Sequence, residues 1–579
     1  MFKELFRVKS VDSILRESEK PEYSLKRALT AVDLTALGVG AIIGAGIFAL
    51  TGTAAAGTVD PVTGEVLRPG AGPGLIVSFI LTGIACGFCA LCYAEFASLI
   101  PISGSAYTYA YATLGELVAW IIGWDLILEY AVGNIAVAVS WSGYFIELLR
   151  GLGLEIPPNW QWLTVSYNVG IHRPEIVAHA PKLFGVPLIV NLPAFGIVAL
   201  LTVILVIGVK ESARFNAIMV GVKLLVLVFF IIVGFVYVKP ENWRPFAPNG
   251  WEGIMTGAAL VFFAYIGFDA VSTTAEETKN PQRDLPLGMI GSLAICTILY
   301  VVTAAVLTGL ISYKELGVAE PLALALRTLD LNWAAGIVAF GAVMATTSVL
   351  LVFQMGQPRI FFSMSRDGLL PARFASVHPR FKTPYLTTIL TGIFVAVPAA
   401  FVDIGDAAEL TNIGTLFAFV LVCAGVIILR HTDPERPRPF KAPLVPAVPL
   451  LGIFSCLYLM ISLPRITWVR FGVWLAVGLL IYAWYGLSHS RLLEAQKRRG
   501  TLRMVLSGVS TIILGFVSLA ASHHYQEALA RATTSGATGQ IQYARSMLTL
   551  TDMGFEAGVI LGLLLVVTAI VLHRSRAET

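Results

Sequence analysis

Glycine interrupts an apolar segment at residues 41–48, where a membrane helix would be continuous. The run reads AIIGAGIF, and its small residues fall near the middle of the segment. A helix that breaks there leaves the backbone N–H groups of Gly44, Ala45 and Gly46 free at the N-terminus of a second half-helix. Unpaired backbone groups are costly in hydrocarbon unless they line a cavity or bind something. Donors at the positive end of a helix dipole suit a carboxylate, so the first break predicts an anion site.

A second interruption lies at residues 262–269, which read FFAYIGFD. A break at Gly267 removes the intrahelical partners of the carbonyl groups of Phe263, Ala264 and Ile266. Acceptors at the negative end of a half-helix suit an ammonium group. A carboxylate site beside an ammonium site describes an α-amino acid. Close helix packing through small residues is the alternative, and the recurrence of the break five spans later favours ligand binding.

Three ionisable residues fall within apolar segments and suggest coupling chemistry. Lys223 is the only basic residue in the interior of a predicted span rather than near one of its ends. Because a buried ammonium is expensive, such a residue is a functional hypothesis by default. Snorkelling or a structural pairing is the alternative, and a position some ten residues inside the span argues against snorkelling. Glu129 and Asp269 are the nearest candidates for partners, although Asp269 could instead cap a half-helix.

The elements that must position these residues are membrane helices. The chain has 579 residues, of which 56% are hydrophobic and 13% charged, against roughly 25% charged in soluble domains. About 20 apolar residues span a bilayer. Fourteen stretches meet that length, near residues 30–55, 75–99, 116–148, 190–208, 215–238, 251–275, 287–312, 333–362, 384–403, 408–429, 443–463, 470–488, 503–522 and 553–572.

Charge placement and the position of the breaks predict the organisation. A cytoplasmic N-terminus puts 27 Lys and Arg inside and 12 outside, and fourteen spans then place both termini in the cytoplasm. Spans 1–5 and 6–10 would be two repeats of opposite direction, each opened by a broken helix. We therefore expect a tail at 1–29 that is no secretory signal, a transport core at 30–430, and four additional spans with a short C-terminus at 431–579. The outer loops 58–73 and 150–189 are interpreted as insertions rather than lids.

All six cysteines lie in apolar spans, and three of them, Cys86, Cys89 and Cys92, have the spacing C-x-x-C-x-x-C. Residues at this spacing fan around a helix, and no further Cys or His lies nearby in the sequence. We interpret the cysteines as small buried residues in packed helices. All eight histidines fall in loops or at span ends, so no metal site is expected.

Several motifs together resemble the amino acid–polyamine–organocation superfamily, and most of all its cationic amino acid transporter branch. The resemblance covers about residues 25–490 and is highly specific because many motifs match at once. It rests on GVGAIIGAGIF at 38–48, YAEF at 93–96, PISGS at 101–105, GWDLILEY at 123–130, GFD at 267–269, EETKNP at 276–281 and PRIFFSMSRDGLLP at 358–371.

The resemblance implies the leucine-transporter fold, five plus five inverted helices with four more. Gly44, Ala45 and Gly46 would then hold the substrate carboxylate. Carbonyl groups of the two breaks would hold the amino group, and Phe263 would also be an aromatic gate; the implied binding residues are Ile42, Ile43, Phe263, Ala264 and Ile266. Proton-coupled relatives have a lysine at the position of Lys223. Phe353 aligns with a position that faces the substrate side chain and is small in members that move arginine or lysine.

The expected function is therefore secondary active amino acid transport in the plasma or inner membrane. A proton-coupled symporter of small neutral amino acids such as alanine is favoured, with no cofactor besides the proton. Amino acid exchange and cationic amino acid uptake stay open, whereas a membrane sensor or an enzyme is less expected. The expected partners are the amino acid, the lipid bilayer and small membrane proteins or a second copy on the extra helices, with no nucleic acid.

Overall fold

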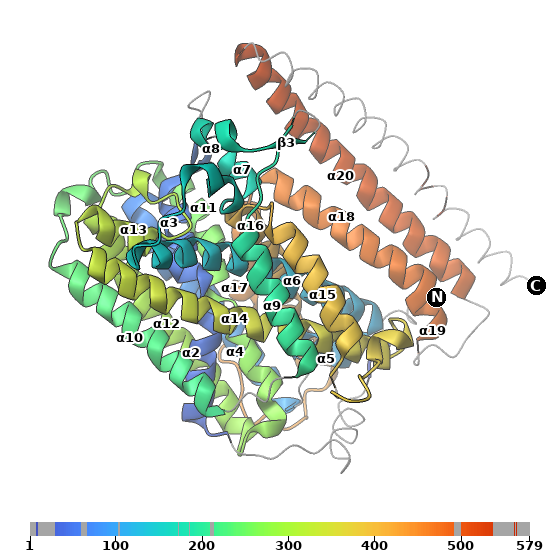
Figure 1. Ribbon diagram of the computed structural model, residues 1–579. Helices are drawn as coiled ribbons and strands as arrows, with labels where there is room; N and C mark the ends of the chain where they lie inside the picture. The colour runs from blue at the N-terminus through green and yellow to red at the C-terminus, as the bar shows by residue number, and fades with distance from the viewer. Residues whose placement is uncertain are drawn as a thin grey trace, which may run out of the picture.

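The computed structural model describes residues 7–9, 29–59, 66–101, 105–171, 173–183, 186–208, 213–381, 383–490, 499–535, 561, 563 and 565. These residues form a bundle of helices with two short strand pairs (Figure 1). The longer helices are α2 (Ala31–Ile42), α4 (Leu75–Leu99), α5 (Ser105–Thr113), α6 (Glu116–Gly151), α9 (Leu192–Ile207), α10 (Ala213–Phe235), α11 (Gly250–Val261), α12 (Pro281–Leu310), α13 (Pro321–Thr328), α14 (Asn332–Arg366), α15 (Tyr385–Ala399), α16 (Ile404–Thr432), α17 (Ala447–Ile461), α18 (Arg465–Ile481) and α20 (Arg499–Ser535).

Shorter elements connect these helices or continue them past a break. The short helices are η3 (Gly46–Leu50), α3 (Thr51–Ala56), η4 (Gly72–Gly74), η5 (Pro158–Leu163), α7 (Tyr167–Gly170), α8 (Pro174–His179), η6 (Pro240–Trp243), η7 (Phe262–Tyr265), η8 (Asp269–Glu277), η9 (Tyr313–Glu315), η10 (Ala372–Ala375), η11 (Tyr482–Gly486) and α19 (Leu487–His489). The antiparallel strand pairs are β1 (Gly57–Val59) with β2 (Val66–Pro69), and β3 (Lys182–Leu183) with β4 (Val186–Pro187).

Helix starts follow the capping chemistry of the sequence. Thr30 caps α2, and its side chain and that of Asp33 satisfy each other's backbone N–H groups. The side chain of Asn191 accepts from the Ala194 N–H at the start of α9. Such caps satisfy amides that the first helical turn leaves without an intrahelical partner.

The number of spans agrees with the prediction only in part. Within the described residues, nine helices are long and apolar enough to cross a membrane, and α2 with η3 and α3 forms one further span bent by 44°. Three apolar helices, α9, α15 and α17, are shorter. The span predicted at 553–572 lies outside the described residues except for three positions. The total of fourteen and the cytoplasmic termini therefore stay predictions.

The two broken helices run antiparallel to each other. The first half of the first one, α2, packs against η8, which is the second half of the second one. Conversely, α3 of the first packs against α11 of the second, and η3 contacts η7 at the crossing. This crossing is what a repeat of opposite direction requires.

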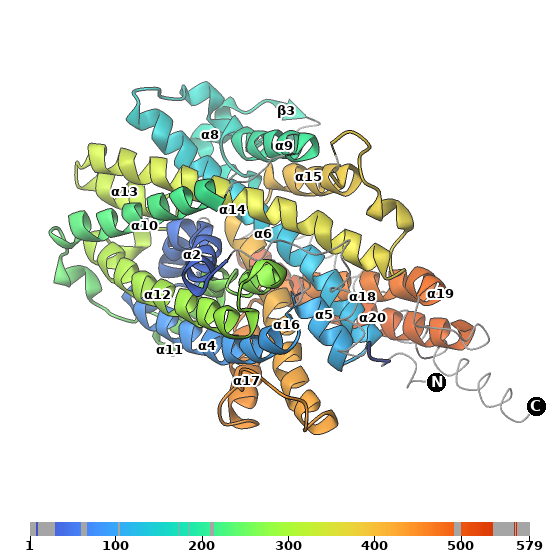
Figure 2. The same cartoon turned by 90° about the horizontal axis from the view of Figure 1, so that it is seen from below.

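The remaining helices enclose this crossing. α4 packs against α12 on one side, and α6 packs against α14 and α16 on the other. α17 lies beside α16 and α4, whereas α18 packs against α16 and α6 and carries α20 on its outer side at the edge of the bundle (Figure 2).

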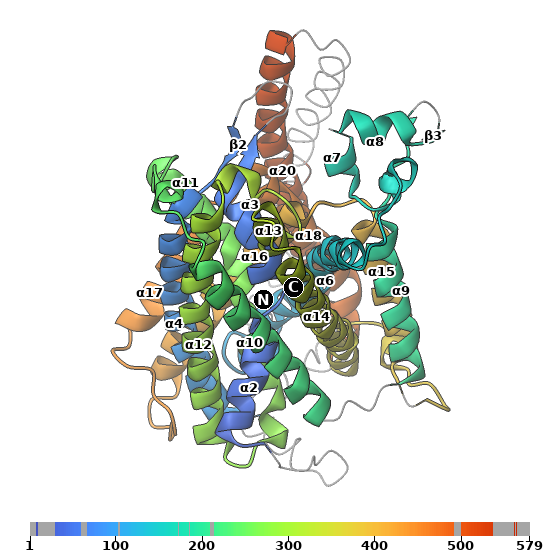
Figure 3. The same cartoon turned by 60° about the vertical axis from the view of Figure 1, so that its left-hand side comes forward.

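One end of the bundle carries most of the irregular structure. The β1–β2 hairpin, α7, α8 and β3 lie together at this end (Figure 3). We call it the outer end, because the charge pattern predicts it to be extracellular, and we call the opposite end the inner end.

Candidate functional site

The two glycine breaks meet in the interior of the bundle. A Cβ atom added to Gly46 would lie 2.3 Å from the Ala264 Cα, so the two backbones are in direct contact. Gly267 has a φ of 121°, and its Cα packs against the carbonyl group of Ala41. Only glycine allows both that backbone conformation and that approach. The predicted juxtaposition of the two breaks is present in the fold.

The first break exposes backbone donors. α2 ends at Ile42, Ile43 is extended, and helical structure resumes at Gly46. Among the described residues, no hydrogen-bond acceptor is found for the N–H groups of Gly44 and Ala45. Both residues are buried. These amides occupy the first turn of the second half-helix, where a helix favours an anion.

The second break exposes fewer acceptors than the sequence predicts. The Phe263 carbonyl accepts a hydrogen bond from the Ile266 N–H at 3.3 Å, because η7 is a tight 3-10 turn. No donor to the carbonyl groups of Ala264 and Ile266 is found among the described residues. The amide of Asn412 donates to the carbonyl groups of Ala259 and Leu260 at 2.7 and 3.0 Å.

Two side chains hold the carbonyl end of α2. The Tyr300 hydroxyl donates to the Ile42 carbonyl at 3.0 Å. The Lys223 Nζ donates to the Gly40 carbonyl at 2.7 Å, and Lys223 is fully buried. Sequence reasoning missed Tyr300 and Asn412, although each is a polar group within an apolar span. A polar side chain within an apolar span is the same signal by which Lys223 was selected from the sequence.

The structure corrects the partners expected for Lys223. Neither Glu129 nor Asp269 forms an ion pair with it among the described residues, and its contact is the Gly40 carbonyl. Asp269 instead accepts from the Gly267 N–H at 3.3 Å, within the break itself, and η8 begins without a side-chain cap, so the capping alternative is not what the described residues show. The Gly40 carbonyl lies in the last turn of α2, where it has no intrahelical donor. A buried carbonyl group needs a hydrogen-bond donor, and Lys223 supplies it.

The acidic residues form a group of their own. Glu129 is buried on α6, one turn after Asp125 on the same helix. Asp125 is buried, and its carboxylate oxygens have no hydrogen-bond partner among the described residues. A Cβ added to Gly414 would lie 2.6 Å from the Asp125 Oδ1, which places that carboxyl group against α16. The sequence analysis did not select Asp125.

Phe353 lies in the interior rather than facing lipid. It is 6% exposed and packs edge-to-face on Tyr130 with ring centroids 5.4 Å apart. One turn earlier on α14, a Val349 methyl lies 2.9 Å from where a Cβ of Gly44 would be. α14 therefore brings Val349 to the first break, whereas the Phe353 ring lies against Tyr130 and Gly133 of α6. Val349 and Tyr130 were not selected from the sequence.

A cavity of about 1240 Å³ opens at the outer end. Both predicted insertions contribute to its wall, through residues such as Arg68 of β2 and Arg173 before α8. Glu147 in the same wall pairs with Arg150 and Arg327. Glu320 lies between α12 and α13, and burial raises the pKa of its carboxyl group above the usual value. The outer loops are thus part of a charged vestibule, which their reading as mere insertions did not foresee.

The family of this protein follows from comparison with known proteins. Residues 29–484 match the family model described as amino acid permease, so the chain belongs to that family and to the amino acid–polyamine–organocation superfamily. It is a multi-pass membrane protein. The predicted family is confirmed.

Similar proteins place the chain within the family. It is 51% identical over 490 residues to the branched-chain amino acid permease BcaP of Bacillus subtilis (strain 168), covering 84% of this chain and 99% of that protein. The methylthioribose transporter of the same organism is 48% identical over 488 residues, with 84% and 99% covered. Cationic amino acid transporter 4, vacuolar, of Arabidopsis thaliana is 40% identical over 437 residues, with 74% and 68% covered. These relatives are named permeases or transporters, not enzymes.

Proposed function

We propose that this protein is a secondary active transporter of neutral amino acids in the plasma membrane, working by alternating access. The observation that carries the proposal is the contact of Gly46 with Ala264. It brings the unpaired amides of the first break to the carbonyl groups of the second. An α-amino acid would place its carboxylate on the amides of Gly44, Ala45 and Gly46. Its ammonium group would lie at the carbonyl groups of Ala264 and Ile266, with the flanking Ile42, Ile43 and Phe263 closing the site.

The side-chain end of the site favours neutral substrates. Val349 presents apolar surface beside the first break, and Phe353 follows one turn later on α14, where its edge-to-face contact with Tyr130 fixes the position of its ring. A hydrophobic lining rejects a charged side chain because the charge would lose its hydration without a partner. The name of the branched-chain permease supports the same class, and alanine and leucine bracket the expected size.

The coupling ion in this proposal is the proton, and Lys223 carries the coupling. As an ammonium it holds the Gly40 carbonyl and thereby fixes α2. Loss of its proton removes the charge from that hydrogen bond, and charge-assisted bonds are roughly twice as strong as neutral ones. α2 is then freer to move, which links proton release to the change in access. Glu129 and Asp269 are the carboxyl groups proposed to pass the proton on.

A second candidate substrate is methylthioribose, since one relative of 48% identity carries that name. This compound has no carboxylate and no ammonium group, so it would use neither end of the two breaks as an amino acid does. The two candidates therefore predict different competition by amino acid analogues.

The test is uptake into proteoliposomes that contain the purified full-length protein. Labelled alanine, leucine, lysine and methylthioribose are compared with and without an inward proton gradient, and with a protonophore as control. We expect accumulation of alanine and leucine only with the gradient. Uptake of lysine alone or of methylthioribose alone contradicts the substrate proposal. Uptake that needs internal amino acid and ignores the gradient identifies an exchanger instead.

A further inference from the structure

Four thiols that are scattered in the sequence meet inside the bundle. Cys89 and Cys92 come from α4, Cys423 from α16 and Cys456 from α17. The Sγ atom of Cys89 is 3.4 Å from that of Cys456 and 3.9 Å from that of Cys423. All four are fully buried. Within the described residues, no group of three or more His, Cys, Asp or Glu side chains is arranged to hold a metal ion.

The cluster lies in the seam where α4 meets α16 and α17. A Cβ added to Gly452 of α17 would be 2.8 Å from the Cys423 Sγ and 3.6 Å from the Cys89 Sγ, so glycine gives the thiols their room. The opposite face of α17 is open to lipid, with Leu451 and Phe454 47% and 64% exposed. One helix therefore separates the thiols from the lipid.

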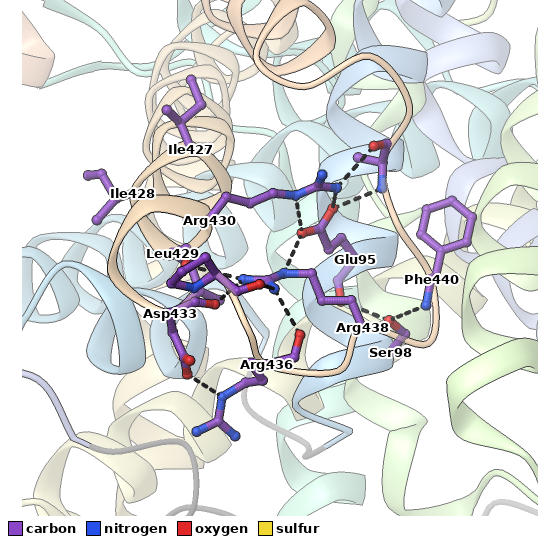
Figure 4. A network of polar contacts seen from close by, with 12 residues as sticks. Glu95, Ser98, Ile427, Ile428, Leu429, Arg430, Asp433, Arg436, Arg438 and Phe440 are labelled. Atoms are coloured by element: carbon purple, nitrogen blue, oxygen red, sulfur yellow. Dashed lines mark hydrogen bonds and ion pairs between the residues drawn. The ribbon is translucent and has the colours of Figure 1, made fainter.

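The inner end of the same seam is held by a polar clamp. Glu95 is one turn beyond Cys92 on α4 and accepts two hydrogen bonds from Arg430, at 2.6 and 3.0 Å (Figure 4). It also accepts from the Ala442 N–H at 2.8 Å, and Arg438 lies 3.3 Å away. The clamp aligns α4 with the α16–α17 connection and so keeps the facing thiols in register.

We propose that Cys89 and Cys456 are an oxidation site whose disulfide ties α4 to α17. The oxidant is a lipid-soluble organic hydroperoxide. The sulfur of one cysteine attacks the outer peroxide oxygen, the O–O bond breaks, and a sulfenic acid and an alcohol form. The second thiol then attacks the sulfenic sulfur, the S–S bond forms and water leaves. Two thiols thus lose two electrons and two protons, and the hydroperoxide is reduced to alcohol and water.

The geometry favours Cys456 over Cys423 as the partner of Cys89. A disulfide requires sulfurs about 2.05 Å apart, and Cys89 with Cys456 needs a smaller approach than Cys89 with Cys423. Cys89 and Cys92 lie on the same helix, so a bond between those two would not join separate helices. A disulfide from Cys89 to Cys456 would join α4 to α17, whereas one from Cys89 to Cys423 would join α4 to α16.

A covalent tie on α4 reaches the site through the second broken helix. Ser78 and Thr82 of α4 donate to the carbonyl groups of Ile254 and Ala258 in α11, at 2.7 and 3.0 Å. The Tyr265 hydroxyl donates to the Phe79 carbonyl at 2.8 Å. These hydrogen bonds make α4 and α11 move as one unit. A disulfide between α4 and α17 would therefore prevent the movement of both helices that the change in access requires. This consequence rests on the proposed function, whereas the chemistry of the disulfide does not.

The test uses the purified full-length protein in lipid vesicles treated with tert-butyl hydroperoxide. We expect the number of thiols titrated after denaturation to fall from six to four, and peptide mapping to find Cys89 joined to Cys456. The melting temperature rises by a few degrees, uptake falls at least tenfold, and dithiothreitol reverses all three changes. Cys456→Ala removes the response, whereas Cys296→Ala, on α12 and outside the cluster, keeps it.

Mapping that finds Cys89 joined to Cys423, or no link at all, overturns the proposal whatever the uptake. A complete Cys89–Cys456 link with unchanged uptake overturns the locking of α4. Mapping and melting need no substrate. If the untreated protein transports no amino acid, the proposed function fails, but peptide mapping still shows whether the Cys89–Cys456 disulfide forms.

Discussion

Replacing Gly46 by alanine tests the contact on which the proposed site depends. The new Cβ would lie 2.3 Å from the Ala264 Cα, whereas ordinary contact begins at 3.4 Å, so the two breaks must separate by about 1 Å. Because the obstacle is backbone, no side-chain rotation relieves it. Overpacking of this kind costs about 1–3 kcal/mol of stability. A shift that breaks one charge-assisted hydrogen bond to the substrate costs roughly 1.5–3 kcal/mol, or about 10- to 150-fold in affinity.

The matched control is Gly87→Ala on α4, since a Cβ there meets nothing within 4 Å. It is expected to leave uptake unchanged and to stabilise the helix by about 0.5–1 kcal/mol. The assay is proton-driven uptake of alanine in proteoliposomes, with melting temperature measured in detergent to count folded protein. Well-folded Gly46→Ala protein with the affinity of the Gly87→Ala control would refute the argument that the two breaks form the site.

Four further substitutions test other parts of the reasoning. Ala45→Leu should abolish uptake without unfolding, because its side chain crowds the exposed amides; the amide of alanine should also fail to compete, and equal competition by it would contradict an amide-bound carboxylate. Phe353→Ser should admit longer side chains, including arginine, while alanine is still transported; an unchanged set of transported amino acids would place Phe353 away from the substrate side chain. Lys223→Ala should lose proton-driven accumulation and its pH dependence but retain substrate-induced thermal stabilisation; wild-type accumulation with the wild-type pH profile would exclude coupling through this residue. Burial raises the pKa of Glu320, and a carboxyl group whose folded-state pKa is raised contributes stability at low pH that is lost as the pH rises. Between pH 5 and pH 8 the melting temperature of Glu320→Gln should therefore fall less than that of the wild type. Parallel plots of melting temperature against pH would show that ionisation of Glu320 does not cause the loss of stability.

The local features of this protein can be predicted from its amino-acid sequence alone. The length of the apolar stretches predicted the membrane helices, and glycine within such stretches predicted the breaks at Gly44–Gly46 and Gly267. Both signals can be found in the sequence because they depend only on neighbouring residues. The order of the breaks also predicted the antiparallel crossing, and the motifs placed the chain in the amino acid permease family. Lys223 stood out for the same local reason, as a charge among apolar residues.

The contacts between residues far apart in the sequence become visible only in the folded bundle. Asn412 reaches carbonyl groups of α11 about 150 residues before it, and Lys223 takes Gly40 rather than a carboxylate. The thiols of Cys89 and Cys456, 367 positions apart in the sequence, lie 3.4 Å from each other, although nothing in the spacing of either cysteine indicates it. In a bilayer, nearly every span presents an apolar surface, so hydrophobic pattern does not distinguish one neighbour from another. Pairing is fixed instead by small residues and buried polar groups on facing helices, and which helices face each other is a property of the packed bundle.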